Sequence, residues 1–196
     1  MSSKIIERVI KDKIYRTTPR ANYLKAILDR LETEYIPILD LIKKHNSQNE
    51  RAIGFWSLIR IIFPVIETVA SIVGKRKEVF LEQDLHVRFG HLVWEIYRNA
   101  LMHTDELRYA VYKEKTISWA AHISIDGTGH IIQKHTRLHP ITIHLDISEL
   151  YFSLRNFLKD EITKKDEKSI HIQVGVHFPD QESKLLKDLE ELYTNY

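Results

Sequence analysis

The chain has 196 residues, of which 43% are hydrophobic and 29% are charged, and its 29 Lys and Arg nearly balance its 27 Asp and Glu, for a net charge of +2. This composition excludes wholesale disorder, and only 6 Gly and 5 Pro exclude a collagen-like or linker-dominated chain. The absence of Cys excludes disulfides, thiolate metal sites and cysteine nucleophiles, and it favours a cytoplasmic location. Because the net charge is so small, any contact with nucleic acid must be local.

The first 112 residues predict helices. Thr18 and Pro19 are a start signal for a helix that continues to about residue 45, with a kink or break at Pro37. A very apolar helix is expected over residues 51–73, and a long helix over residues 84–112.

The most apolar stretch of the chain runs from Ile53 to Gly74. It contains Arg60, Pro64 and Glu67, and a membrane span would have to bury both charges. We therefore expect a core helix that ends at Gly74, and no membrane partner. The basic run that follows, residues 75–77, is expected to be a solvated connector, with a role in guiding RNA as the alternative.

After residue 115 the pattern alternates between apolar and polar residues, which predicts strands. Asp146 is a plausible cap for a helix over residues 147–163, and a last charged helix is expected after residue 179. The expected strands cover residues 117–125, 131–137, 141–146 and 170–178, with a hairpin turn at 126–129 between the first two.

We therefore expect a single α+β domain over residues 1–196. A helical bundle would occupy residues 18–112, and strands with two helices would occupy residues 113–196. The small sheet would lie in the C-terminal half of the chain and be mostly antiparallel.

The helix expected around residue 98 carries two apolar stripes. Trp94, Tyr97 and Leu101 form one of them. A helix that is apolar on two sides is sandwiched either inside a bundle or between subunits, so the pattern suggests a homodimer. The other stripe, the expected core stripe, contains Leu85, Phe89, Leu92, Ile96, Ala100, His103 and Leu107.

Arg98 and His103 are expected on the two lips of a groove whose floor includes Glu95 and Asn99. An Arg binds phosphate through paired hydrogen bonds, and a His takes or gives a proton near neutral pH. Cleavage of an RNA backbone without a metal requires both functions, because the 2′-hydroxyl loses a proton, the leaving 5′-oxygen gains one, and the phosphate carries extra charge between the two steps. Glu95 is a candidate for orienting either side chain.

Arg98-Asn99-Ala100-Leu101-Met102-His103 resembles the signature of the HEPN superfamily (higher eukaryotes and prokaryotes nucleotide-binding), in which an Arg, a polar residue, a spacer and a His lie on a late helix of a helical bundle. The resemblance implies a homodimeric, metal-independent endoribonuclease that needs no cofactor. Arg98 would clamp phosphate, His103 would be the general acid and base, and Asn99 would support them. Asp105 stands where some toxin members carry a Tyr, so that subgroup's chemistry is not implied. The implied partners are RNA, a second copy of the chain and, for a toxin-like or defence role, a protein inhibitor.

Alternatives remain open both for the bundle and for the expected strands. The chain would then be a non-catalytic bundle that binds a nucleotide or a protein partner. In it His103 would be a buried structural residue, and Arg98 would pair with Asp105 or anchor a subunit interface. The expected strands place His122, His144 and His171 on polar faces. These faces would bind a metal ion or stack on RNA bases, or they would be ordinary solvated faces of a sheet without a binding function. Without Cys the metal signal is weak, and no metal site is expected.

Overall fold

A computed structural model describes residues 7–10, 13–48, 54–99, 110–112, 115–123, 131–134, 141–164 and 168–176. The fold is α+β and mainly helical with small sheets, which confirms the predicted class. The chain divides into two compact units: Met1–Tyr23 together with Asp166–Tyr196, and Leu24–Lys165. The last predicted helix, after residue 179, lies outside the described residues.

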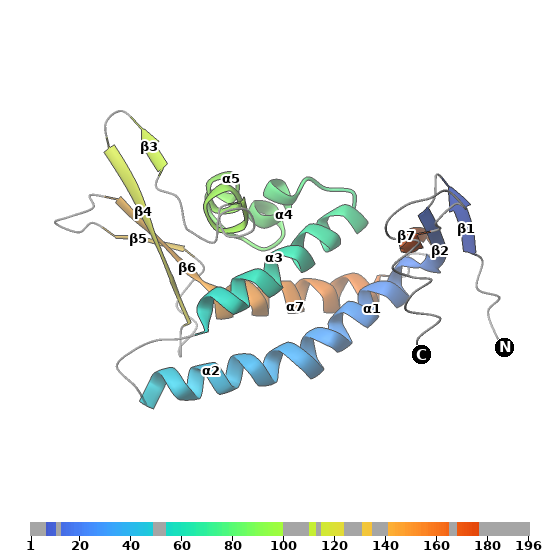
Figure 1. Cartoon of the computed structure of the whole chain (residues 1–196), viewed down its shortest axis with the longest axis horizontal. Coiled ribbons are helices and arrows are strands. Elements are labelled where there is room, and N and C mark those ends of the chain that lie inside the picture. The colour runs from blue at the N-terminus through green and yellow to red at the C-terminus, as the bar shows by residue number, and fades with distance from the viewer. Residues whose placement is uncertain are drawn as a thin grey trace, which may run out of the picture. The chain divides into compact units, whose positions relative to one another are not determined.

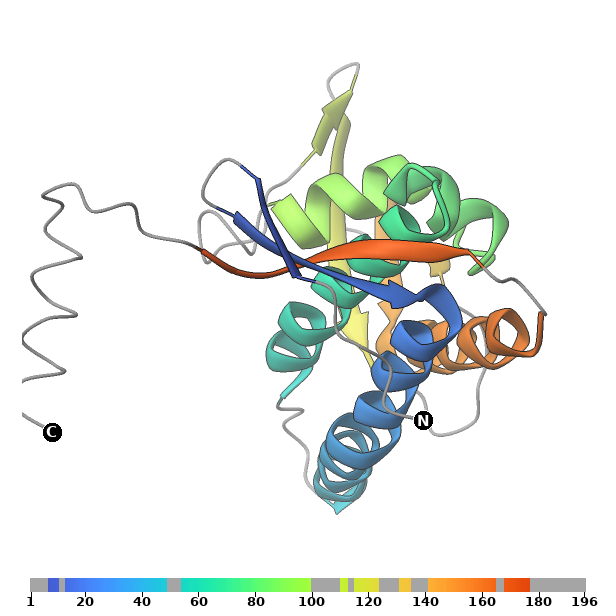
Figure 2. The ribbon, with the colours of Figure 1, turned by 90° about the vertical axis from the view of Figure 1, so that its right-hand side faces the viewer.

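The first unit contains an antiparallel sheet with the strand order β1 (Glu7–Ile10), β2 (Lys13–Pro19) and β7 (Ser169–Val176). Figure 2 shows β7 beside β2, and Thr17 Oγ1 lies 3.0 Å from His171 Nδ1 although the two residues are 154 positions apart. The prediction of helix from the N-terminus, and of a sheet confined to the C-terminal half, was therefore wrong. The β-branched and aromatic residues of β2 suit a strand, and their pairing with β7 determines the structure.

A long helical stretch starts at Arg20, continues into the second unit from Leu24 and contains one wide turn. α1 (Arg20–Arg30) continues through the π-helical segment η1 (Leu31–Tyr35) into α2 (Ile36–Gln48). The predicted start after Pro19 is confirmed. Pro37 widens the helix rather than breaking it, because a proline has no N–H to donate and its ring crowds the carbonyl four residues earlier.

α3 (Phe55–Ile72) is the core helix of this unit. Ile59, Ile62, Phe63 and Ile66 on it are all buried, as predicted for a core helix. Gly74, with a φ of 73°, follows its last turn in the left-handed conformation that ends many helices. Among the described residues no single helix is long and apolar enough to cross a membrane. Trp56–Ile72 of α3 and the next helix, Lys77–Gln83, meet those criteria only as a pair bent by 95°.

The long helix predicted over residues 84–112 was wrong at both ends. α4 (Lys77–Gln83) comes first and includes the end of the basic run that was predicted to be a connector. A turn then leads to α5 (Gly90–Val93) and the π-helical segment η2 (Trp94–Asn99). β3 (Ala110–Tyr112) is a strand where helix was expected.

A second sheet packs at one end of these helices (Figure 1) and has the strand order β3, β4 (Lys115–His122), β6 (Ile141–Asp146) and β5 (Ile131–Lys134). β4 pairs with β6 in parallel, and the other pairs are antiparallel. The hairpin predicted between the strands now named β4 and β5 was wrong as a pairing, because β6 lies between them. Residues 126–129 themselves lie outside the described residues.

α7 (Ile147–Thr163) follows β6 directly and confirms the predicted helix and its cap. The Asp146 carboxylate accepts hydrogen bonds from the backbone N–H groups of Ser148 and Glu149, at 3.0 and 3.2 Å. These bonds satisfy amides that have no partner inside the helix. Figure 1 shows α7 running alongside α3.

The polar face predicted for β6 is not a solvated one. Thr142 and Asp146 are buried, His144 is half-buried, and Ile143 and Leu145 on the other face are buried as well. The central strand of this sheet is therefore covered on both faces.

Candidate functional site

Arg98 lies on η2 and forms an ion pair with Glu67 of α3, with 3.0 Å between Arg98 Nη2 and Glu67 Oε2. Its guanidinium carbon lies 5.7 Å from the centre of the Trp94 ring, and its side chain is 21% exposed. The carboxylate on one side and the aromatic face on the other fix the direction of the guanidinium. Glu67 therefore supplies a carboxylate partner for Arg98, whereas Asp105, the partner considered from the sequence, lies outside the described residues.

Glu67 also receives a second cation. Lys77 Nζ of α4 lies 3.4 Å from Glu67 Oε1 and 4.7 Å from the centre of the Trp94 ring. We call Glu67, Lys77, Trp94 and Arg98 the Glu67 cluster. In it a single carboxylate faces two cations, so the cluster has an excess of positive charge.

The core holds the cluster in place. Trp94 is 2% exposed, and its ring packs 5.6 Å from that of Phe63, which is buried one turn before Glu67 on the same helix. A buried indole beside a buried phenyl ring cannot reorient without opening the core, so both cations rest on a fixed surface.

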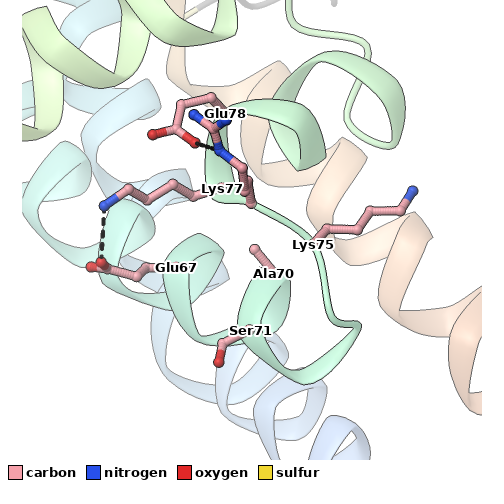
Figure 3. Close-up of a pocket in the computed structure, with 7 residues that line it drawn as sticks. Glu67, Ala70, Ser71, Lys75, Lys77 and Glu78 are labelled. Atoms are coloured by element: carbon pink, nitrogen blue, oxygen red, sulfur yellow. Dashed lines mark hydrogen bonds and ion pairs between the residues drawn. The ribbon is translucent and has the colours of Figure 1, made fainter.

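A cavity of about 390 Å³ adjoins Glu67 (Figure 3). Figure 3 shows Lys77 reaching across to Glu67, whereas Lys75 points away from it. Lys75 instead pairs with Asp84, with its Nζ 2.6 and 2.8 Å from the two carboxylate oxygens. The cavity is lined by Glu67, Ala70 and Ser71 of α3 and by residues 75–78 of the connector and α4.

Arg76 is the most exposed cation of this lining, with 72% of its side chain accessible. Its Nε lies 3.6 Å from Glu78 Oε2, a distance typical of a weak surface pair. The exposed Ser71 also lines the cavity. The cavity lining thus includes an exposed cation, Arg76, a cation paired with Glu67, Lys77, and a serine, which are residue types that bind phosphate oxygens.

The other predicted site residues are only partly described. Glu95 is exposed on η2, and Asn99 ends that segment, with its side chain outside the described residues. His103 lies outside the described residues altogether. The structure thus places Arg98 and Lys77 on the same carboxylate, that of Glu67. The pairing of Arg98 with His103 in one site stays a prediction.

Three residues of the two apolar stripes predicted around residue 98, Trp94, Ile96 and Tyr97, are each at most 3% exposed, whereas Leu92 is half-buried. The stripe residues from 100 to 107 lie outside the described residues. Tyr97 Oη lies 2.8 Å from the carbonyl oxygen of Ala120 and 3.0 Å from that of Ile143, so the second stripe faces the sheet. Burial raises the pKa of the Tyr97 hydroxyl, which stays a hydrogen-bond donor at any physiological pH. This stripe therefore carries no argument for a second subunit.

The metal alternative finds no support among the residues that the structure describes, since no group of three His, Asp or Glu side chains there is placed to hold an ion. His144 and His171 belong to strands of different sheets. The polar faces predicted for these two strands therefore belong to different sheets.

Sequence reasoning missed Glu67, Lys77 and Trp94 as site residues. The available signal was the run Lys75-Arg76-Lys77 next to a helix whose only acidic residue is Glu67. Comparisons with protein-family models, with curated proteins and with solved structures find no match for this chain.

Proposed function

We propose that the chain binds RNA through backbone phosphates at the Glu67 cluster and the adjoining cavity. The observation that carries the proposal is the sharing of Glu67 by Lys77 and Arg98, at 3.4 and 3.0 Å, beside a cavity that Arg76 also lines. A phosphate arriving there would meet more positive than negative charge. Because the overall charge of the chain is only +2, this local excess is the relevant attraction.

Arg98 suits the role of a phosphate clamp. A guanidinium has several N–H donors in one plane, and pairing with Glu67 through Nη2 orients that plane. The cost of ordering the side chain is met by folding, before any ligand arrives. A phosphate that accepts two hydrogen bonds from one guanidinium requires a guanidinium plane that is oriented in this way.

The resemblance to the HEPN superfamily extends this proposal to metal-independent cleavage of RNA. In that reaction the 2′-oxygen attacks the phosphorus as it loses its proton, and the 5′-oxygen leaves as it gains one. Arg98 would stabilise the charge on the phosphate, and His103 would transfer the protons, with Asn99 and Glu95 in support. Two copies of the chain would form one composite site, and a cytoplasmic location is proposed with it.

The test compares RNA binding and cleavage in EDTA by the wild type, Arg98→Ala, Lys77→Ala and His103→Ala, with Arg155→Ala as the control. Arg155 is paired with Glu32, away from the cavity. We expect weaker binding for the first two variants, unchanged binding for the control, and loss of cleavage with retained binding for His103→Ala. Equal affinity in all five proteins would overturn the binding proposal, and equal cleavage by the wild type and His103→Ala would overturn the catalytic one.

A second function is favoured by the partial burial of Arg98. A guanidinium that is 21% exposed and ion-paired inside the chain also fits a structural role in a non-catalytic bundle that binds a nucleotide or a protein partner. In that case Arg98→Ala and His103→Ala would lower the melting temperature strongly, and the wild type would not bind RNA. Analytical ultracentrifugation of the wild type tests the homodimer separately.

A further inference from the structure

The turn between α4 and α5 exposes an aromatic ring in a disfavoured backbone conformation. Phe89 has a φ of 61°, in the left-handed region that bulky residues avoid, and it is 42% exposed. His86, in the same turn, has a φ of 55° and is also exposed. The prediction that Phe89 belongs to the core stripe was therefore wrong.

Two backbone hydrogen bonds to α4 hold this turn in place. The N–H of Leu85 donates to the Phe80 carbonyl at 3.1 Å, and the N–H of Val87 donates to the Leu81 carbonyl at 2.8 Å. Leu85 and Val87 are fully buried and anchor the turn in the core. His86, Arg88 and Phe89 are exposed to solvent.

The residue after Phe89 must be glycine. A Cβ on Gly90 would lie 2.5 Å from the Glu78 carbonyl oxygen, which is closer than Cβ atoms approach any backbone atom. The N–H of Gly90 donates to Glu82 Oε1 at 2.8 Å. The start of α5 is thus locked against α4, and the fold keeps Phe89 at the surface although burial would be the usual place for it.

The exposed side chains of this turn share one chemistry. The guanidinium carbon of Arg88 lies 5.2 Å from the centre of the Phe89 ring, and His86 and His91 are exposed beside them. Each of these side chains has a flat face, and Arg88 carries a positive charge. The nearby carboxylates are engaged, since Glu82 accepts from Gly90 and Asp84 pairs with Lys75.

We infer that Phe89, with Arg88 beside it, is a stacking site for an unpaired nucleobase of single-stranded RNA. Aromatic rings and guanidinium planes are the groups on which splayed bases stack, and positive charge beside them suits the phosphates of the same strand. An apolar protein partner would need a larger apolar surface. The other exposed large hydrophobic residues among those described, Ile38 and Leu41, lie on α2.

This inference rests on the proposed RNA binding and adds the state of the RNA, which must be single-stranded at this point. Phe89 lies at the beginning of the helical run that η2 completes, and Arg98 lies near its end. In this proposal one strand places a base at Phe89 and a phosphate at Arg98.

The experiment measures the fluorescence anisotropy of a labelled, single-stranded RNA of about twelve nucleotides, its duplex, and an abasic strand of the same length. The proteins are the wild type, Phe89→Ala, Phe89→Leu and Phe89→Trp, with Leu41→Ala as a control at an exposed apolar position of α2. Melting temperatures establish that each variant is folded. A 2-aminopurine base in the RNA reports stacking directly, because stacking changes its fluorescence.

We expect Phe89→Ala and Phe89→Leu to lower the affinity for the single strand roughly 5- to 100-fold, and Phe89→Trp and Leu41→Ala to leave it close to wild type. The abasic strand should bind all five proteins equally and weakly. Wild-type affinity in folded Phe89→Leu, or equal affinity of the wild type for the abasic strand, overturns the inference. If Arg98→Ala weakens binding and Phe89→Ala does not, the proposed function stands without it; if the wild type binds no RNA, both fail.

Discussion

Two carboxylates in the larger unit are each shared by two cations, and each cluster adjoins a π-helical segment. Glu32 lies on η1, and its Oε1 receives Arg155 Nε at 2.8 Å, Arg155 Nη2 at 2.7 Å and Lys159 Nζ at 3.1 Å. Both cations come from α7, one turn apart. This Glu32 cluster therefore joins α7 to η1, and a structural role accounts for it.

The Glu67 cluster has the same ratio of charges and a different construction. Its two cations come from different elements, they contact different oxygens of the carboxylate, and both lie over the Trp94 ring. Glu67 and Lys77 also line a cavity. The comparison shows that an excess of positive charge does not by itself define a binding site. Rigid support and an adjoining cavity distinguish the two clusters.

The largest expected difference in RNA affinity between the two clusters comes from removing both cations of each. We expect Lys77→Ala with Arg98→Ala to lower RNA affinity roughly 100-fold near physiological salt, because two phosphate contacts are lost. The slope of log affinity against log salt should fall by about 0.7 for each contact to a single strand. Arg155→Ala with Lys159→Ala should change affinity less than about twofold. Equal losses in the two double variants, measured by anisotropy from about 50 to about 200 mM salt, would contradict the distinction.

A second, smaller effect concerns the tyrosines that anchor the two π-helical segments. Tyr97 on η2 hydrogen-bonds to carbonyls of the second sheet, and the Tyr151 hydroxyl donates to the carbonyl of Leu31 on η1. Each Tyr→Phe change should lower the free energy of unfolding by about 1 kcal/mol, measured by urea denaturation. Only Tyr97→Phe should also weaken RNA binding, since η2 carries Arg98. An RNA effect of Tyr151→Phe as large as that of Tyr97→Phe would argue against a special role for η2.

The sequence predicts those parts of this architecture whose causes are local. Asp146 before Ile147 predicts the start of α7, since a side chain that caps backbone amides works within three residues. The alternating residues of β6 predict a strand, although not which strands it pairs with. Pairing partners are set by contacts between distant residues, and for that reason β1, β2 and the position of β6 between β4 and β5 were missed.

The candidate site likewise has one part that a local motif predicts and another part that depends on distant contacts. Arg98 was identified from its motif, but its carboxylate partner lies 31 residues away on α3 and has no local signature. The turn at residues 84–89 was missed because Leu85, Phe89 and Leu92 repeat at helical spacing. Gly90 was the one local sign that the chain passes close to another backbone there.

The smallest expected effect is the dependence of the Glu32 cluster on pH. Hydrogen bonds from Lys159 and then Arg155 lower the pKa of Glu32 from its usual value of 4.5. The unfolded chain therefore binds a proton at this carboxyl more readily than the folded chain does. Its contribution to stability is complete above about pH 4.5, and it is lost as the pH falls through the lowered pKa of the folded state.

Glu32→Gln removes this titration, and Glu34→Gln on the same segment is the matched control, since Glu34 is exposed. We expect the wild type to melt at a higher temperature than Glu32→Gln at neutral pH, and the difference to shrink as the pH falls below about 4.5. Glu34→Gln should follow the wild type over the whole range. RNA affinity at neutral pH should be unchanged in both variants, because the Glu32 cluster lies outside the proposed site. A pH-independent difference in melting temperature would mean that the packing of the side chain, and not its charge, joins α7 to η1.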